Sequence, residues 1–178
     1  MQICRLFADI LDYPAPILAD RVEDLLPLAV AHGEAAQLLR QFRKFVEETT
    51  PEDLEELYAG TFDLQPLCCP YIGYQIFGEE YRRGMFMAQL REYFRSCGFT
   101  AGNDLPDHLC IILRFLASRE AGEVERELVT DCLVPALEKM VSGLAESTNP
   151  YRGMLQALLL FLEGYSGCNV PVAEWGEA

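Results

Sequence analysis

NDLPDHLCIILRFL, residues 103–116, shows most directly how this chain folds, because a polar loop becomes a strongly apolar segment within it. Its apolar side chains recur at the three- and four-residue spacing that lines one face of an α-helix: Leu105, Leu109, Ile112, Leu113 and Leu116. The same stretch places Asp107 beside His108, one of two histidines in the chain, where the loop becomes helical. It therefore predicts a buried helix with polar side chains at its beginning.

The same helical spacing extends over most of the chain. Apolar positions repeat in this way within residues 18–26, 38–46, 54–62, 86–97, 133–144 and 155–162. Thr50-Pro51 predicts a helix start, whereas Gly98 and His32-Gly33 each predict a helix end. No segment of convincing length alternates between apolar and polar residues, as a half-buried strand would. We predict an all-α fold, a single-domain bundle of about seven or eight helices over residues 1–164, with a loosely ordered acidic tail at 165–178.

The charge of the chain restricts its partners. With 28 acidic and 14 basic residues among 178, the net charge is −14. Such a charge repels nucleic acids and anionic membrane surfaces and attracts cationic segments, although it also simply keeps a protein soluble. No apolar run approaches the roughly 18 residues of a membrane span, and Asp9 and Asp12 interrupt the N-terminal apolar stretch where a secretory signal would continue. We therefore expect a cytosolic protein without stable membrane insertion.

Metal, redox and catalytic signatures are weak or missing from the sequence. The seven cysteines include no Cys-x-x-Cys pair and the two histidines lie far apart, so we expect no metal site and no cofactor. Cys68-Cys69, between Pro66 and Pro70, leaves two interpretations open: burial beneath a loop, or a thiol-dependent redox or metal role. The chain has no glycine-rich phosphate loop and no hydrolase or metalloprotease motif, so we expect a protein that is not an enzyme.

Asp107 and His108 each have two interpretations on the sequence alone. If Asp104 caps the helix, Asp107 is its third helical residue and can simply complete the cap. We expect His108 to be mostly neutral, because the positive end of the helix dipole disfavours an imidazolium. A neutral ring there could bind a peptide backbone or a guanidinium, or it could be satisfied by a loop carbonyl.

Residues 63–78 form the longest break in the helical pattern, with two prolines, two glycines and three aromatic residues. Long apolar connections of this kind are more often functional than idle. With Tyr58 and Phe62 they would make an apolar wall for an incoming amphipathic helix, although such aromatic residues are also common in a core. Glu79-Glu80 and Arg82-Arg83, which follow, have the pattern of a solvated helix start.

Six short stretches carry a family resemblance through their order and spacing: LFADILDYP (6–14), EELYAGTFDL (55–64), CPY (69–71), RRGM (82–85), LPDHL (105–109) and NPY (149–151). Together they resemble the NarJ branch of the TorD/DmsD/NarJ family, the cytosolic chaperones that mature molybdenum oxidoreductases. The resemblance covers roughly residues 1–164 and implies the same single all-helical domain. The middle stretch departs from the TorD and DmsD pattern at Cys68-Cys69 and Tyr71, which favours the NarJ branch.

The resemblance implies binding rather than catalysis. Such a protein would hold the N-terminal segment of a nitrate-reductase-like catalytic subunit, a twin-arginine leader or its basic vestige, and assist cofactor insertion and assembly. The family's peptide site corresponds here to Tyr58, Phe62, Pro70, Tyr71, Pro106, Asp107 and His108, and more loosely to Arg83 and Gly84. We expect a monomer or a weak, domain-swapped dimer, with no nucleic-acid partner.

Two other classes of function stand beside this hypothesis. One is a structural assembly subunit that stays in a membrane-associated redox complex and releases no client. The other is a small thiol-dependent redox or metal-binding protein built on Cys68-Cys69.

Overall fold

The chain is all-α in a computed structural model that describes every residue except 1, 31, 64–67, 121 and 164–178. Its α-helices are α1 (Gln2–Ile10), α2 (Leu18–Leu25), α3 (Gly33–Glu48), α4 (Pro51–Tyr58), α5 (Ile72–Phe77), α6 (Tyr81–Ser96), α7 (Leu109–Ala117), α8 (Glu123–Glu127), α9 (Val134–Gly143) and α10 (Tyr151–Glu163). Three further segments continue them: the 3₁₀-helix η1 (Leu26–Ala29) and the π-helices η2 (Ala59–Asp63) and η3 (Leu128–Leu133). The predicted all-α class is confirmed, and the short helices α5 and α8 add to the longer ones that the periodicity indicated.

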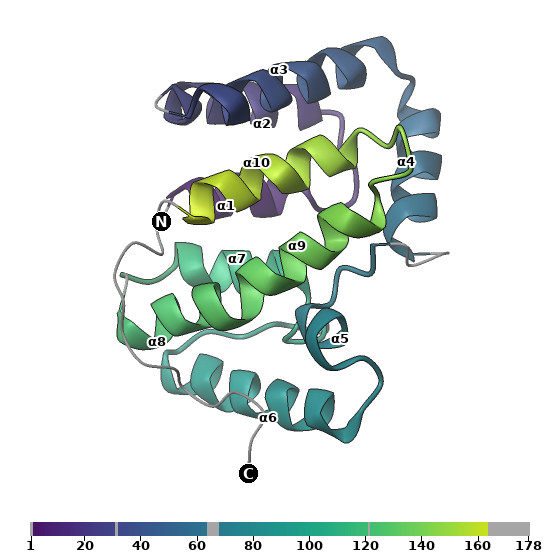
Figure 1. The fold of residues 1–178 in the computed structure, drawn as a ribbon. Helices are drawn as coiled ribbons and strands as arrows, with labels where there is room; N and C mark the ends of the chain where they lie inside the picture. Colours follow the sequence, from purple (N-terminus) through teal and green to yellow (C-terminus); the bar gives the residue numbers. More distant parts are fainter. Residues whose placement is uncertain (1, 31, 64–67, 121, 164–178) are drawn as a thin grey trace.

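The helices are stacked in a series of layers (Figure 1). The α3 helix lies at one end of the molecule and α6 at the other, with α10, α1, α9 and α7 between them. Along one side, α4 connects the α3 end to the middle layers. The α10 helix packs against both α3 and α9, and α1 packs against both α2 and α7. No helix in the described part of the chain is long and apolar enough to cross a bilayer.

A continuous apolar core follows from the helical periodicity. Buried positions in α7 include Leu109, Ile112 and Leu116, three of the side chains whose spacing predicted this helix. In α10, Tyr151, Leu155 and Leu158 are buried against α3 and α9. Each fully buried leucine or aromatic side chain contributes about 1.5–3 kcal/mol through the area removed from water, so packing rather than helix propensity holds these helices in place.

Local signals explain several helix boundaries. The hydroxyl of Thr50 accepts a hydrogen bond from the backbone N–H of Asp53 at 3.2 Å, so the predicted cap of α4 is confirmed. Gly98 has φ +70°, a left-handed conformation that glycine adopts at little cost, just beyond the end of α6. Pro135 lies in the first turn of α9, directly after the π-helix η3, so the change from π-helix to α-helix occurs at this proline.

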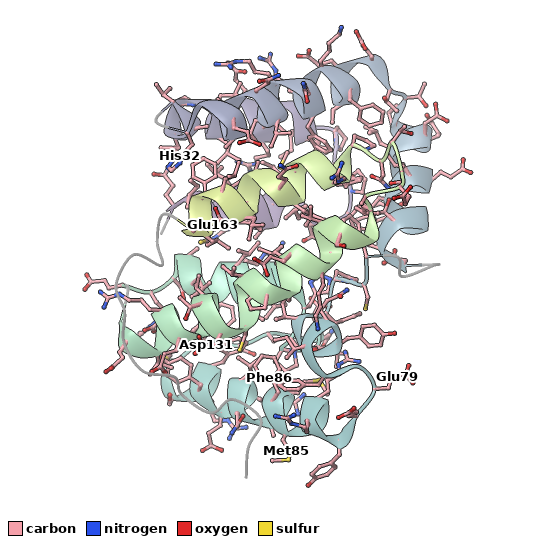
Figure 2. All side chains as sticks on the ribbon, viewed as in Figure 1. His32, Glu79, Met85, Phe86, Asp131 and Glu163 are labelled. Carbon is pink, nitrogen blue, oxygen red and sulfur yellow. The ribbon has the colours of Figure 1, made fainter. Side chains whose placement is uncertain are left out.

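Three expectations about boundaries are wrong. His32-Gly33 does not end a helix, because α3 begins at Gly33; the His32 ring packs on Phe161 of α10 at 4.9 Å, and Figure 2 shows it beside the C-terminal end of α10. Asp104 does not cap α7 and Asp107 is not its third residue, because the helix begins at Leu109 and His108 is the cap. The caps at both places contact distant segments, His32 with Phe161 and His108 with Tyr71.

Part of the predicted connection 63–78 is helical. The α5 helix occupies Ile72–Phe77 and packs against α6 and α9, so the aromatic side chains of this stretch lie on a short helix. Residues 64–67 of the connection, and the predicted acidic tail at 165–178, lie outside the described residues. The predicted division into a domain at 1–164 and a tail therefore stays a prediction.

Candidate functional site

Two distant parts of the chain meet through backbone hydrogen bonds at the start of α7. Tyr71 and His108 form an isolated antiparallel bridge. The N–H of Ile72 donates to the carbonyl of Asp107, and the N–H of Leu109 donates to the carbonyl of Pro70, both at 2.7 Å. We call this pairing of residues 70–72 with residues 107–109 the clip. It brings together Pro70, Tyr71, Asp107 and His108, which the family resemblance had placed in one site.

The carboxylate of Asp107 is fully buried behind the clip and faces an arginine of the same chain. The Nε–H of Arg83 donates to Asp107 Oδ2 at 2.9 Å, and 19% of the Arg83 side chain remains exposed. The other oxygen, Oδ1, is buried and has no hydrogen-bond partner. The guanidinium of Arg83 also lies over the rings of Tyr71 and Tyr74, at 5.2 and 5.7 Å from their centroids. Arg83 is therefore part of the site rather than of a solvated helix start, which corrects that interpretation.

Gly73 allows α5 to approach this ion pair closely. A Cβ at this position would lie 2.9 Å from Asp107 Oδ2, 2.9 Å from Cδ1 of Phe86 and 3.2 Å from Cγ of Arg83. Those distances are too short for a carbon atom, so any side chain would push α5 away from α6. The absence of a side chain at Gly73 therefore keeps the clip and the Arg83 guanidinium together.

His108 is both the cap of α7 and a partner of Tyr71. Its Nδ1 accepts a hydrogen bond from the backbone N–H of Cys110 at 3.2 Å, and its ring meets the edge of Tyr71 at 5.3 Å. Burial lowers the pKa of His108, although Asp12, Asp104 and Asp107 nearby partly oppose that shift. The ring is therefore neutral at pH 7, with Nδ1 occupied and the proton on Nε2, where it can donate a hydrogen bond.

Tyr58 and Phe62 lie in an aromatic cluster completed by Tyr151 and Tyr13. Tyr58 and Phe62 are 5% and 4% exposed, and the rings of both contact Tyr151, at 6.0 and 5.1 Å. Tyr13, which is 52% exposed, meets the edge of Tyr58 at 5.5 Å and covers it from the solvent side. The two residues implied by the family resemblance are thus part of the core in this conformation, and Tyr13 is their exposed neighbour.

The clip and the aromatic cluster are neighbours through the end of α1. The carbonyl of Leu11 accepts hydrogen bonds from the hydroxyl of Tyr58 at 3.4 Å and from the thiol of Cys110 at 3.3 Å. The next residue, Asp12, forms an ion pair with Arg114 of α7 and influences the pKa of both Tyr58 and His108. Asp63 at the end of η2 also helps to raise the pKa of both Tyr13 and Tyr71, so both rings lie within range of the same carboxylate.

Exposed carboxylates line α4, next to the aromatic cluster. Glu52, Asp53, Glu55 and Glu56 are all exposed on α4, the helix that carries Tyr58. Asp53 and Glu56 line a pocket of about 420 Å³ with Thr61 and Asn149, at the junction of η2 and the start of α10. Several exposed carboxylates therefore lie on the helix that carries Tyr58, where they attract cationic side chains.

The vicinal thiols lack the properties of a reactive pair. Cys68 and Cys69 are both buried, and burial raises the pKa of Cys68 to about 12 and raises that of Cys69 as well. A protonated thiol is a poor nucleophile and a poor metal ligand. Among the described residues, no group of three or more His, Cys, Asp and Glu side chains is arranged to hold a metal ion.

Two residues implied by the resemblance lie away from these contacts. Gly84 is exposed on α6, and a Cβ there would meet nothing within 4 Å. Pro106 is buried and lines a separate pocket of about 270 Å³ with Phe94 and Phe99. The sequence interpretation missed Gly73 and Tyr13, because only the tertiary structure shows the carboxylate beside one and the ring beneath the other.

The comparisons with known proteins agree with the all-helical fold and identify the family. The family model described as "Nitrate reductase delta subunit" matches residues 29–157, well over half of the chain. The chain belongs to the nitrate reductase delta subunit family. This is the family that holds the assembly chaperones of the NarJ branch, so the expected resemblance is confirmed and membership supports a chaperone rather than a catalyst.

Individual relatives of this delta-subunit family member point the same way. The chain is 28% identical to the probable nitrate reductase molybdenum cofactor assembly chaperone NarJ of Bacillus subtilis over 135 residues, 75% of this chain and 72% of NarJ. It is 28% identical over 150 residues to the nitrate reductase-like protein NarX of Mycobacterium tuberculosis, covering 84% of this chain but 22% of NarX. The crystal structure of a redox enzyme maturation protein from Archaeoglobus fulgidus matches with a TM-score of 0.61 and 25% identity, covering 90% of this chain and 91% of that one.

Proposed function

We propose that this protein is a cytosolic chaperone that binds the N-terminal segment of a molybdenum oxidoreductase catalytic subunit of the nitrate reductase type and assists cofactor insertion and assembly. Its membership of the delta-subunit family supports the class of function. The observation that carries the binding proposal is the clip, which brings Tyr71 and His108 into contact. Tyr13 offers a second, exposed ring, and exposed carboxylates line α4.

The described surface supports recognition of a basic amphipathic segment. The exposed ring of Tyr13 and the half-buried ring of Tyr71 offer apolar contacts, and an amphipathic helix or extended segment can lay its apolar side on them. The Nε2–H of the neutral His108 can donate to a backbone carbonyl of the client. A few such anchors supply most of the binding energy in typical interfaces.

The carboxylates have a separate role in this proposal. The exposed acids of α4 attract the positive charges of the client and orient the segment as it approaches. Tyr58 and Phe62 support the site from beneath, and they become contact residues only where Tyr13 moves aside. Asp107 is already paired with Arg83, so the client's first cationic contacts are with the exposed acids rather than with Asp107.

Calorimetric titration with the client's N-terminal peptide tests this proposal. Tyr71→Ala and Tyr13→Ala each remove an accessible ring and should weaken binding by about 1–3 kcal/mol, roughly five- to 150-fold. Tyr81→Ala is the matched control, because Tyr81, the first residue of α6, is 84% exposed and its replacement removes the same side chain. Unchanged binding in both site variants would overturn the proposed surface.

Copurification distinguishes a chaperone from a retained subunit. A chaperone that releases its client should be absent from the finished enzyme, whereas a structural subunit should copurify with it in fixed stoichiometry. The same preparation, analysed by sedimentation, decides between the monomer and the weak, domain-swapped dimer that we expect. A thiol-dependent function has no support from the protonated, buried Cys68 and Cys69.

A further inference from the structure

The surroundings of Arg83 have the composition of a binding site for a guanidinium group. Two aromatic rings, Tyr71 and Tyr74, face the guanidinium, and the Asp107 carboxylate lies behind it at 2.9 Å. Aromatic faces attract cations, and a planar guanidinium stacks on them better than an ammonium does. We call Tyr71, Tyr74 and Asp107 the cage. In the structure it is filled by a side chain of the same protein.

The resident arginine does not use all of the cage. Arg83 binds Asp107 through its Nε alone, and the buried Oδ1 is left without a hydrogen-bond partner. A carboxylate binds a guanidinium most strongly when both oxygens accept parallel hydrogen bonds from it. A guanidinium that entered from outside could satisfy both oxygens, whereas Arg83 satisfies one.

The Arg83 side chain is only partly buried. It lies in the first turn of α6, and 19% of its side chain is exposed although its carboxylate partner is fully buried. Part of the Arg83 side chain thus reaches the solvent while the carboxylate that it pairs with does not, and the cage opens in this proposal when that side chain rotates outward. Tyr71 belongs to both the cage and the clip, so an occupant of the cage would touch the proposed peptide surface.

We propose that this cage is a binding site for an arginine side chain of the client, and that Arg83 occupies it as an internal substitute until the client arrives. The proposal rests on the proposed function, because it assigns one position of the client segment. Exchange of one guanidinium for another keeps the buried Asp107 neutralised throughout, which avoids the high cost of an unpaired buried charge. A lysine could not replace either group fully, because it neither stacks as a plane nor bridges two oxygens.

The first test uses N-methylguanidinium alone and needs no client. Arg83→Ala empties the cage, and we expect millimolar N-methylguanidinium to raise the Tm of this variant by about 2–4 °C at saturating concentration. Methylammonium should not do so, and Arg91→Ala is the control, because Arg91 is an exposed arginine on the same helix. Where Arg83→Ala does not fold, Arg83→Lys replaces it, with a smaller rise expected because its ammonium still pairs with Asp107. Equal effects of the two ions would overturn the cage.

The second test uses the client's N-terminal peptide and a version with its arginines changed to lysine. If Arg83 competes with the client, Arg83→Ala should bind the arginine peptide roughly tenfold more tightly than the native chain does. The lysine peptide should gain nothing. Equal losses for both peptides would mean that Arg83 only supports the fold and would overturn the exchange. Rescue by N-methylguanidinium without any peptide binding would support the cage and overturn the proposed client instead.

Discussion

The two ends of the helix stack are held in different ways. At one end, α3 packs on α10 through apolar side chains such as Leu39 and Phe42, which are almost completely buried. At the other end, α6 adds polar contacts to its apolar ones. Arg83 pairs with the buried Asp107 near the start of α6, and the Tyr93 hydroxyl donates to the buried Glu125 at 2.8 Å near its end.

The α3 end contains contacts that stabilise the fold, whereas the α6 end also contains the groups proposed to bind a ligand. Apolar packing tolerates exchanges between side chains of similar volume, and it offers no charge to a ligand. A buried carboxylate, by contrast, requires a specific partner. The α6 end carries the clip and the cage, and the α3 end carries neither. The polar end is therefore the one whose contacts the proposed binding of a cationic segment would change.

The largest effect should come from breaking the buried ion pair. Asp107→Asn leaves Arg83 without its charged partner in a mostly buried position, and we expect a loss of about 3–5 kcal/mol in the free energy of unfolding. Arg5→Met breaks the exposed pair with Asp9 and should cost less than about 1 kcal/mol. Urea denaturation measures both. Similar losses would remove the distinction between the two kinds of contact.

The close approach of α5 to α6 should be almost as sensitive. Gly73→Ala places a Cβ 2.9 Å from Asp107 Oδ2 and from Cδ1 of Phe86, so we expect a loss of about 1–3 kcal/mol. Gly84→Ala adds the same methyl group to an exposed position on α6 with nothing within 4 Å, where we expect a gain of up to about 1 kcal/mol. A pair of variants with the same sign would contradict the proposed packing.

The apolar core contains a buried polar atom whose removal should stabilise the protein. The hydroxyl of Tyr151 is buried without a hydrogen-bond partner, so Tyr151→Phe should raise the free energy of unfolding by about 1 kcal/mol. Tyr58→Phe removes a hydroxyl that donates to Leu11, and it should instead lower the free energy of unfolding by about 1 kcal/mol. Thermal unfolding of the two variants side by side checks the opposite signs.

The smallest effect that we expect is a dependence on pH. Burial lowers the pKa of His108, so between its folded and unfolded pKa values the unfolded chain binds more protons than the folded chain. The free energy of unfolding should therefore fall as the pH drops below about 6.5, the ordinary pKa of histidine. His108→Gln should fall less over the same range. Identical slopes for the two proteins, from denaturation at several pH values, would contradict a buried neutral ring.

Much of the fold could be predicted because helices follow local rules. The spacing of Leu109, Ile112 and Leu116 places them on one buried face, and Thr50 caps α4 through its own neighbour Asp53. Gly98 follows the end of α6 in a left-handed backbone conformation, which glycine adopts at little cost. The boundaries at His32 and Asp104 could not be predicted, because contacts with distant helices decide between alternatives that are locally similar.

The candidate site was only partly predictable. The motif around Asp107 and His108 was visible in the sequence, and so was its family. Its geometry was not, because the partner of Asp107 lies 24 residues earlier in the chain, and the partner of His108 in the clip lies on a separate segment.

Periodicity, capping residues and composition by themselves determined an acidic all-helical protein and the positions of most of its helices, since each depends on residues a few places apart. Only the tertiary structure decided that Tyr58 and Phe62 are buried, that Tyr13 covers them and that Arg83 fills the space before Asp107. The physical reason is that burial and ion pairing depend on which helices meet, and that choice is made by the packing of the whole chain.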